Sequence, residues 1–336
     1  MMRPRAEATV LGSGSWGTAL AILLARNGHE VALYGRDPEE IGAMSALREN
    51  LRYLPGFAIP EGVRFGLLHE ADPGDLTVVA VPSGAVRGVL SALPGTPAGI
   101  LVASKGLDHD SGHLLSQVAA TIKPGVPVGV LSGPNLAVEI VRGVPTAAVA
   151  ASASPELADR ARAAFGCASF RVYASDDVTG VEVAGALKNV LAIGSGMAEG
   201  LGFGDNTKGA LLARGLKEII ALGLAMGGRL ETFLGIAGVG DLFATAASPL
   251  SRNNRLGAAM GRGLSLAEAI EEVGQTAEGV PTSEIVGQLA REHGVPMPLF
   301  AGIEAVLRGR MRAADGVALL MERATREEGL SDVLRR

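Results

Sequence analysis

The chain is poor in cysteine, histidine and clustered positive charge, and each shortage excludes a class of protein. Cys167 is the only cysteine among the 336 residues, so the sequence allows no internal disulfide and no cysteine-based metal cluster, which fits a reducing cytoplasm. The five histidines are scattered along the chain, so we do not expect a zinc enzyme or any other metal site. The net charge of −5 and the lack of a basic stripe argue against a nucleic-acid partner.

Long apolar segments are also missing. No stretch has the 18 or more uninterrupted apolar residues that a membrane span requires. The basic start MMRPR and the apolar residues 8–25 resemble a signal peptide, but three glycines interrupt the apolar part. We therefore expect a soluble, cytoplasmic protein. With 48% apolar and 19% charged residues, the chain is globular and long enough for two domains.

A glycine motif near the N-terminus predicts a dinucleotide site. Residues 8–11 form a short apolar strand, and the sequence GSGSWG follows it with Gly12, Gly14 and Gly17 at G-x-G-x-x-G spacing. A helix that ends at Asn27 and a second strand, EVALYGRD, complete a unit of about thirty residues, the context in which this motif is specific. Gly12 permits the tight turn, Gly14 lets the backbone approach a pyrophosphate, and Gly17 lets helix pack on strand. The alternative is a plain glycine-rich turn.

Further apolar strands, separated by helical segments, predict a mostly parallel sheet that is buried on both faces. These strands are expected at residues 75–83, 99–106, 126–135 and 144–152. Ligands of such sheets bind beyond the carboxyl ends of the strands. The residues at those ends are Pro82, Ser83, Lys105, Gly133 and Asn135. A lysine in such a place is also commonly a plain surface residue.

The strand pattern stops after residues 170–177, and helical periodicity takes over. Helices are expected at 178–200, 205–227, 255–272 and 281–293. The sequence thus predicts an α/β protein with an N-terminal Rossmann-like dinucleotide-binding domain, residues 1–177. An all-α domain, residues 178–336, follows it and is expected to bind the substrate and carry out catalysis.

Lys188 is one of only five lysines, yet it lies in the apolar run VEVAGALKNVLAIGSGMAEG. On a helix it shares a face with Ala184, Gly185, Leu191, Ala192 and Ser195. No acidic residue lies three or four positions away to form a surface pair, and the small residues leave room for a ligand to approach the ammonium. The alternative is a lysine that extends to water along an apolar surface.

Two segments of the second half add charged and polar groups. Asp241 follows Gly-x-Gly in an apolar stretch, and a buried carboxylate needs a cationic partner such as Lys188. The alternative is a cap for a helix that starts at Leu242. The sequence SRNNR, residues 251–255, places a serine N-cap and an arginine at the opening of a helix, which suits a phosphate group. An ordinary capped helix explains this stretch equally well.

Ten stretches in the same order resemble the bacterial NAD(P)-dependent glycerol-3-phosphate dehydrogenases over nearly the whole chain. They are GSGSWGTALA, YGRD, NLRYLPG, VAVPS, ASKGL, SGPNLAVE, GALKNVLAIGSG, GDNTKGALLARGLKE, GVGDLF and SRNNRLG. The family interconverts glycerol 3-phosphate and dihydroxyacetone phosphate with NADH or NADPH. Asn135 stands where the family usually has Ser or Thr, Leu136 where it often has Phe, and the LTC that often follows the aspartate is absent.

The resemblance also implies roles for individual residues. Those lining the cofactor, in addition to the three glycines of the motif, would be Ser15, Trp16, Arg36, Tyr53, Lys105, Ala137, Arg252 and Glu278. Those lining the substrate would be Lys105, Gly133, Asn135, Lys188, Asp241, Ser251, Arg252 and Asn253. Lys188 would donate and accept the proton, with Asp241 as its catalytic partner, and Arg252 would contact both ligands. The amide of Asn135 can still donate to a substrate oxygen.

The end of the second strand bears on cofactor choice. It reads Gly35-Arg36-Asp37, in which Arg36 can pair with a 2′-phosphate and Asp37 either caps the helix that begins at Pro38 or binds the ribose. We expect Asp37 to cap, and hence NADPH to be preferred with NADH still used.

A homodimer is expected, although the sequence pattern does not fix the number of subunits. Glycerol 3-phosphate from the reaction would supply phospholipid synthesis.

Two other functions remain open. A 3-hydroxyacid dehydrogenase shares a Rossmann domain, a helical domain and a Lys-Asn pair, but the SRNNR phosphate site speaks against it. A non-catalytic dinucleotide sensor could keep the three glycines of the motif but would have no need for Lys188 and Asp241.

Overall fold

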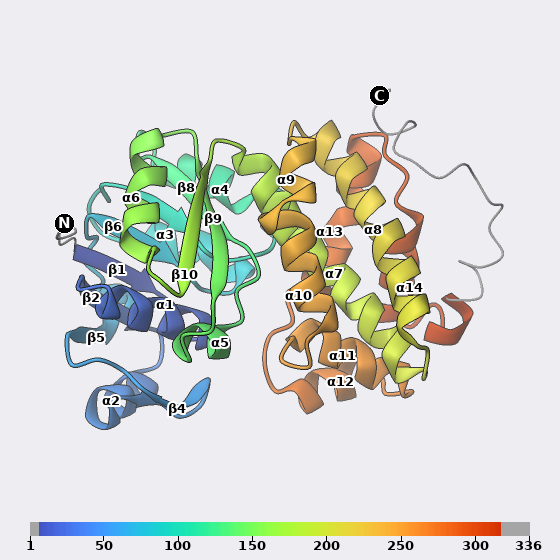
Figure 1. Cartoon of the computed structure of the whole chain (residues 1–336), viewed down its shortest axis with the longest axis horizontal. Coiled ribbons are helices and arrows are strands. Elements are labelled where there is room, and N and C mark those ends of the chain that lie inside the picture. The colour runs from blue at the N-terminus through green and yellow to red at the C-terminus, as the bar shows by residue number, and fades with distance from the viewer. Residues whose placement is uncertain (1–6, 317–336) are drawn as a thin grey trace. The chain divides into compact units, whose positions relative to one another are not determined.

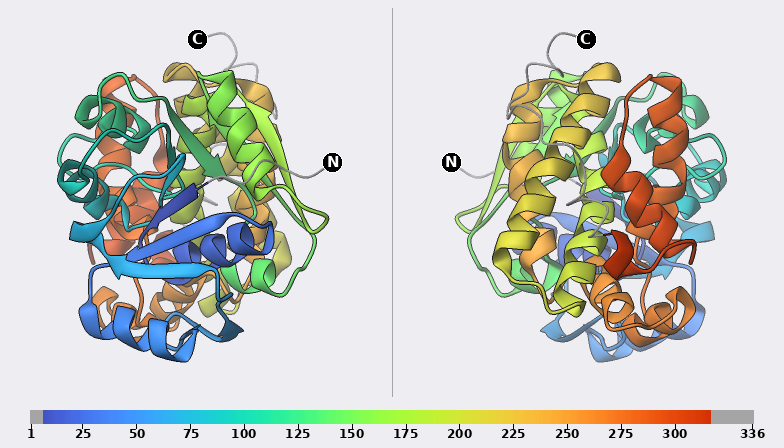
Figure 2. Two further views of the ribbon diagram at one scale, coloured as in Figure 1. Left: turned by 90° about the vertical axis from the view of Figure 1, so that its left-hand side faces the viewer. Right: turned by 90° about the vertical axis from the view of Figure 1, so that its right-hand side faces the viewer.

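The computed structural model describes residues 7–316, which divide into two compact units (Figure 1). The first, here called the sheet unit, runs through Asp108 and resumes over His113–Val178. The second, the helical unit, contains His109–Gly112 and continues from Thr179. All strands of the described residues lie between Glu7 and Ser175, coloured blue to green in Figures 1 and 2.

The sheet unit is built on eight strands in the order β10-β9-β8-β7-β6-β1-β2-β5. Their bounds are β1 Glu7–Leu11, β2 Glu30–Gly35, β5 Val63–Leu67, β6 Leu76–Val79, β7 Ile100–Val102, β8 Val128–Ser132, β9 Thr146–Ser152 and β10 Phe170–Ser175. Every neighbouring pair is parallel except β8 and β9, so the prediction of a mostly parallel sheet is confirmed. A separate two-stranded sheet joins β3, Glu49–Asn50, and β4, Leu54–Ala58.

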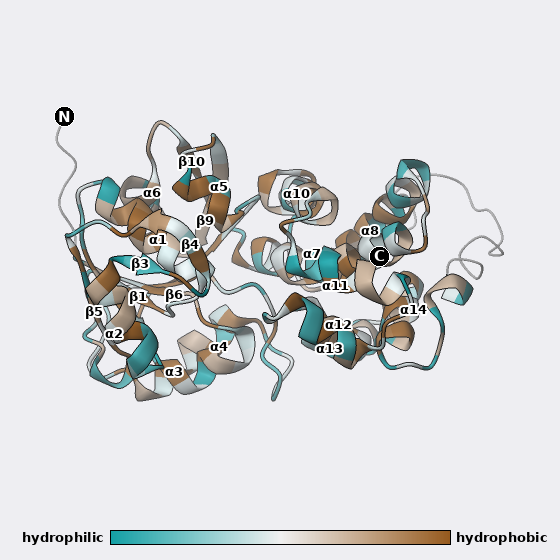
Figure 3. Ribbon diagram, turned by 90° about the horizontal axis from the view of Figure 1, so that it is seen from below, coloured by the Kyte–Doolittle hydropathy of each residue, from teal (hydrophilic) through white to brown (hydrophobic). Residues whose placement is uncertain are grey.

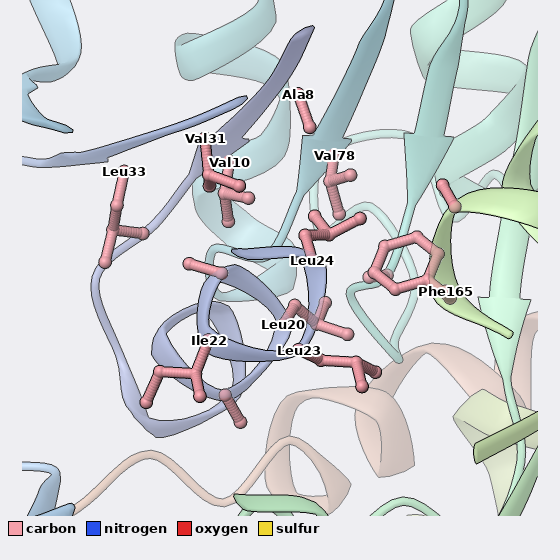
Figure 4. Close-up of a cluster of buried hydrophobic side chains, with 14 of the residues drawn as sticks. Ala8, Val10, Leu20, Ile22, Leu23, Leu24, Val31, Leu33, Val78 and Phe165 are labelled. Carbon is pink, nitrogen blue, oxygen red and sulfur yellow. The ribbon is translucent and has the colours of Figure 1, made fainter. Parts of the chain in front are cut away.

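Helices connect these strands and cover the sheet. They are α1 Ser15–Arg26, α2 Pro38–Leu47, α3 Val86–Ala92, α4 Leu115–Ile122, α5 Ala137–Val141 and α6 Pro155–Phe165, with short 3₁₀ turns at Leu68–Glu70 and Ser83–Ala85. Leu20 and Leu24 of α1 belong to one buried cluster with Val10, Val78 and Phe165 (Figure 4). Apolar side chains on both faces of the strands explain why their sequences are continuous apolar runs rather than alternating ones.

The helical unit contains helices of very unequal length. They are α7 Val178–Gly200, α8 Asp205–Ala225, α9 Leu230–Leu234, a π-helical turn Ile236–Gly240, α10 Asp241–Ala247, α11 Arg252–Gly261, α12 Leu266–Val273, α13 Gly279–Glu292 and α14 Pro298–Leu307. The expected bounds of the first long helix, 178–200, are confirmed. The single helix expected at 255–272 was wrong: Gly263 has φ +104°, and Ser265 then caps a new helix with Glu268.

Helix α7 is the centre of this unit, since its residues from Gly180 to Ala198 are all buried. A helix that is buried on all sides and is mostly apolar is a core helix. Its glycines let α11 approach: a Cβ on Gly196 would lie 2.0 Å from the Asn254 carbonyl oxygen, and one on Gly257 would lie 2.0 Å from that of Ile193. The surface helices α12 and α13 instead carry both apolar (brown) and polar (teal) stretches in Figure 3. Within residues 7–316, none of the helices combines the length and the apolar character needed to cross a membrane.

Candidate functional site

The glycine-rich turn lies between β1 and α1, as predicted, and its three glycines meet different surroundings. Gly12 has φ +116°, and a Cβ there would lie 2.6 Å from the Ala80 carbonyl oxygen. A Cβ on Gly17 would lie 1.8 Å from the Gly12 carbonyl oxygen. Gly14 has an ordinary φ of −69°, and a Cβ there would meet no atom within 4 Å. The fold therefore requires glycine at 12 and 17, whereas the requirement at 14 points to a group outside the chain.

The N-terminus of α1 is suited to an anion. Gly14 is its N-cap residue and provides no side-chain cap to the first N–H groups of the helix. Ser15 and Trp16 open the helix and are half-buried. The Trp16 indole Nε1–H donates to the Ala103 carbonyl oxygen at 3.0 Å, which fixes the ring beside the end of β7. Ser15 and Trp16 thus lie next to the turn at which the glycine motif predicts a bound diphosphate.

The end of β2 confirms the prediction that Asp37 is a helix cap. Its Oδ1 accepts hydrogen bonds from the backbone N–H groups of Glu39 at 2.9 Å and Glu40 at 3.4 Å, and Pro38 is the first residue of α2. The Asp37 carboxylate is therefore engaged by its own helix. Arg36 is exposed.

Tyr53 is half-buried in the segment between β3 and β4. Its backbone N–H donates to Asn50 Oδ1 at 3.0 Å. The Arg52 guanidinium lies 5.1 Å from the centre of the Tyr53 ring. The position of Tyr53 is therefore set by its near neighbours in the sequence, Asn50 and Arg52. All three residues lie in the stretch NLRYLPG, one of the ten that resemble the dehydrogenase family.

The ends of β7 and β8 bring together the three residues expected there. Lys105 Nζ donates to the Gly133 carbonyl oxygen at 2.7 Å. Gly133 has φ +138°, and a Cβ on it would lie 2.9 Å from the Ala147 carbonyl oxygen. The same carbonyl accepts from Asn135 Nδ2 at 3.0 Å, so one amide hydrogen that was expected to serve a ligand is used by β9. Asn135 Oδ1 is buried and has no hydrogen-bond partner among residues 7–316. Ala137 follows as the half-buried first residue of α5.

Lys188 and Asp241 form a buried ion pair in the helical unit. Lys188 is 5% exposed and Asp241 1%. The Lys188 Nζ donates to Asp241 Oδ1 at 2.6 Å and also to Thr245 Oγ1, whose hydroxyl lies 3.3 Å from the same carboxylate oxygen. The predicted pairing of these charges is confirmed, and the alternative of a lysine extended to water is wrong. The capping alternative is also wrong, because Gly240 is the N-cap of α10 and the carboxylate faces Lys188.

Part of the small-residue face around Lys188 is covered by α10 and is not open to a ligand. The Ser195 hydroxyl donates to the Ala246 carbonyl oxygen at 3.2 Å. Small residues on α7 thus bring α10 close enough for its Asp241 to reach Lys188. The expectation of open space along the whole face needs this correction.

The start of α11 has the predicted serine cap. Ser251 Oγ accepts from the Asn254 backbone N–H at 3.2 Å. Burial lowers the pKa of the Arg252 guanidinium, while the Glu278 carboxylate raises it and Arg255 lowers it further. Arg252 and Glu278 are therefore close enough to interact, and a second anion beside Arg252 would stabilise its charge.

Asn253 is part of a buried amide network. Its Nδ2 donates to Asn189 Oδ1 at 3.0 Å, and its Oδ1 accepts from the Gly279 backbone N–H at 2.9 Å. These bonds connect α7, α11 and α13, so Asn253 has a clear structural role besides the expected contact with substrate.

Asn189 and Thr245 were not selected from the sequence. A signal existed for both: Asn189 is an amide directly after Lys188, and Thr245 lies one helical turn after Asp241.

The candidate residues thus form two sets, one in each unit. Neither set resembles a metal site. His109 and His113 are four residues apart, but within residues 7–316 there is no group of three or more His, Cys, Asp or Glu side chains that could hold a metal ion.

Comparison with known proteins identifies relatives of nearly the full length. The N-terminal part of the family described as NAD-dependent glycerol-3-phosphate dehydrogenase matches residues 7–158, and its C-terminal part matches residues 177–318. The chain is 47% identical to a glycerol-3-phosphate dehydrogenase (NAD(P)+) of Acidovorax sp. strain JS42 over 321 residues, covering 94% of this chain and 97% of that protein. A crystal structure of glycerol-3-phosphate dehydrogenase from Coxiella burnetii has a TM-score of 0.90 and 36% identity, covering 95% of this chain and 99% of the other. The Saccharomyces cerevisiae enzyme has a TM-score of 0.80 and 27% identity, covering 95% and 100%.

Proposed function

Because the chain belongs to the NAD-dependent glycerol-3-phosphate dehydrogenase family, we propose that it interconverts sn-glycerol 3-phosphate and dihydroxyacetone phosphate with a nicotinamide cofactor. The observation that carries this proposal is the buried pair of Lys188 and Asp241, 2.6 Å apart. Two buried charges contribute little net stability, since their desolvation costs several kcal/mol per ion, so their presence in a core points to chemistry.

The sheet unit is proposed to bind the dinucleotide. The open backbone at Gly14 and the uncapped N-terminus of α1 fit a diphosphate, and Arg36 fits the 2′-phosphate of NADPH. The proposed cofactor-binding residues also include side chains from both units. In the sheet unit they are Ser15, Trp16, Tyr53, Lys105 and Ala137, and in the helical unit they are Arg252 and Glu278. Capping by Asp37 supports a preference for NADPH over NADH, because the carboxylate is positioned by α2 through its Oδ1.

The helical unit is proposed to supply the acid and base. The bound cofactor supplies or accepts the hydride. In reduction, the Lys188 ammonium polarises the ketone oxygen of dihydroxyacetone phosphate and donates a proton to it; in oxidation, the neutral amine accepts the hydroxyl proton. Asp241 keeps the ammonium in place, and Thr245 adds a second hydrogen bond that fixes its direction.

Substrate recognition follows from the remaining groups. The start of α11, with Ser251, Arg252 and Asn253, presents N–H groups and a guanidinium to the phosphate. Lys105, Gly133 and Asn135 would contact the rest of the substrate. We assign residues 1–177 to the dinucleotide-binding domain and 178–336 to the substrate and catalytic domain. We further propose a cytoplasmic homodimer that provides glycerol 3-phosphate for phospholipid synthesis.

The experiment that tests this proposal follows the absorbance of reduced nicotinamide with three substrates: dihydroxyacetone phosphate, dihydroxyacetone and a 3-oxoacid. We expect turnover mainly with the phosphorylated ketone. Arg252→Ala should raise the KM for dihydroxyacetone phosphate by about ten- to a hundredfold, because a charged contact contributes roughly 1.5–3 kcal/mol. The variant should change the KM for dihydroxyacetone much less.

The other outcomes separate the alternatives. Turnover of the 3-oxoacid in place of the phosphate ester would indicate a hydroxyacid dehydrogenase. Cofactor binding without turnover of any substrate would indicate a sensor. If Arg252→Ala raises the KM for dihydroxyacetone phosphate and for dihydroxyacetone by the same factor, Arg252 does not bind the phosphate.

A further inference from the structure

Asp241 is preceded by the π-helical turn Ile236–Gly240, an uncommon element that is often found beside functional residues. The Gly240 N–H donates to the Gly235 carbonyl oxygen, five residues earlier, at 3.2 Å. Each residue of an α-helix advances by about 100°, so a turn shorter by one residue would rotate Asp241 away from Lys188 by that angle. The π turn therefore sets the direction of the Asp241 carboxylate.

Gly238 holds this turn against the backbone of Phe233. A Cβ on Gly238 would lie 2.0 Å from the Phe233 carbonyl oxygen, 2.3 Å from its carbonyl carbon and 2.5 Å from its Cα. Backbone atoms cannot rotate out of the way as the end of a side chain can. The π turn thus keeps its shape only while residue 238 is glycine and the backbone of residue 233 stays in place.

The Phe233 ring fixes the backbone of residue 233 in turn. The side chain is fully buried at 0% exposure. Its tip sits in a notch between two glycines: a Cβ on Gly223 of α8 would lie 2.0 Å from Phe233 Cζ, and one on Gly228 would lie 3.1 Å from the same atom. In a close-packed interior the ring has no alternative position.

We propose that Phe233, Gly223 and Gly238 are positioning residues for the reaction, acting through Asp241. The glycine notch seats the ring, the ring places the backbone of Phe233, and that backbone shapes the π turn that aims the carboxylate at Lys188. This inference rests on the proposed function, because it assigns the target of the positioning to the Lys188–Asp241 pair.

The test uses a rescue that the geometry predicts. Gly223→Ala should lower kcat at least tenfold, since a displacement of about 1 Å at a catalytic group can cost about 10²-fold. The KM for the cofactor should change less than about twofold, because Asp241 is not among the residues proposed to line the cofactor. The three atoms nearest to a Cβ at 223 would be Cζ, Cε1 and Cε2 of the ring, at 2.0, 2.6 and 2.8 Å, and these are the atoms that Phe233→Leu removes. The double variant Gly223→Ala/Phe233→Leu should therefore regain the kcat of Phe233→Leu alone.

Gly238→Ala provides the contrast. It should lower kcat at least as much, but Phe233→Leu should not restore it, because its clash is with backbone atoms. Gly209→Ala, on the same helix as Gly223 but with no atom within 4 Å of the added Cβ, should leave kcat unchanged and is the matched control. Thermal unfolding of each variant reports folding separately.

The outcomes distinguish this inference from the proposed function. Wild-type protein that does not turn over dihydroxyacetone phosphate would contradict the function itself. Active wild-type protein with folded Gly223→Ala or Gly238→Ala variants that keep kcat within about twofold would overturn the positioning role. The positioning role would also be overturned if Phe233→Leu restores kcat in both the Gly223→Ala and the Gly238→Ala variants, or in neither. If Gly223→Ala does not fold, the kcat of the double variant still decides the question.

Discussion

The glycine-rich turn of the sheet unit and the ion pair of the helical unit reach their geometry in opposite ways. The turn is local: Gly12, Gly14 and Gly17 lie within six residues, and each has its own reason to be glycine. The ion pair is distant, since Lys188 and Asp241 are 53 residues apart. A binding turn can therefore be recognised as a short motif, whereas a catalytic pair depends on how whole helices pack.

Glycine illustrates this difference. In the sheet unit Gly12 and Gly133 occupy positive φ values that turn the backbone beside a strand end. In the helical unit Gly196 and Gly257 have no such need and instead remove side chains where α7 and α11 touch. The first use leaves backbone groups available to a ligand. The second brings the helices α7 and α11 close together.

The largest expected effect on activity comes from breaking the Lys188–Asp241 ion pair. Lys188→Ala should lower kcat by about 10²–10⁴-fold, the usual contribution of a positioned acid or base, or by more if the ammonium also anchors substrate. Binding of NADPH, measured by fluorescence titration, should remain near that of the wild type. The Lys188→Ala variant also leaves Asp241 buried without its cation, so thermal unfolding should be measured alongside. Activity above about one tenth of wild type would exclude Lys188 as the acid and base.

A smaller effect separates the glycines of the local motif. Gly14→Ala should raise the KM for either cofactor by about tenfold and leave the melting temperature unchanged, since the added methyl meets only space that a ligand would use. Gly17→Ala should lower the melting temperature strongly, because its Cβ would lie 1.8 Å from the Gly12 carbonyl oxygen. Equal loss of stability in both variants would show that Gly14 is also needed by the fold.

The same contrast explains what could be predicted from the sequence. Features that depend on neighbouring residues were predicted correctly. They are the strand, turn and helix around Gly12, the bounds of α7, and the helix caps at Asp37 and Ser251. The Lys188–Asp241 pair was predicted for another reason. A lone charge in an apolar segment needs a partner, and Asp241 is a carboxylate that also lies in an apolar stretch of the second half.

Other features could not be predicted. The reversal of β9 relative to β8 leaves no signal, because a continuous apolar run has no direction. Helix α9 and the π turn, each of five residues, are too short to show a period, and a π turn departs from the 3.6-residue repeat. Thr245 becomes relevant only once α10 and α7 are known to touch. Tertiary packing, rather than local sequence, determines each of these.

The smallest expected effect concerns the choice between the two cofactors, which depends on Arg36 and Asp37. Asp37 Oδ1 accepts from two backbone N–H groups of α2, so the helix cap sets the position of this carboxylate. Arg36 is exposed, so its contact with a 2′-phosphate is weakened by water and salt. We therefore expect a preference for NADPH of only about five- to tenfold in kcat/KM.

Arg36→Ala should remove most of this preference by raising the KM for NADPH, with the KM for NADH nearly unchanged. The preference should also shrink as salt is raised, because a contact between exposed charges is screened. Asp37→Asn serves as the control, since an asparagine still caps the helix and should leave the preference in place. A higher kcat/KM with NADH in the wild-type enzyme, or a large shift towards NADPH in Asp37→Asn, would mean that Asp37 contacts the ribose despite its position as the cap of α2.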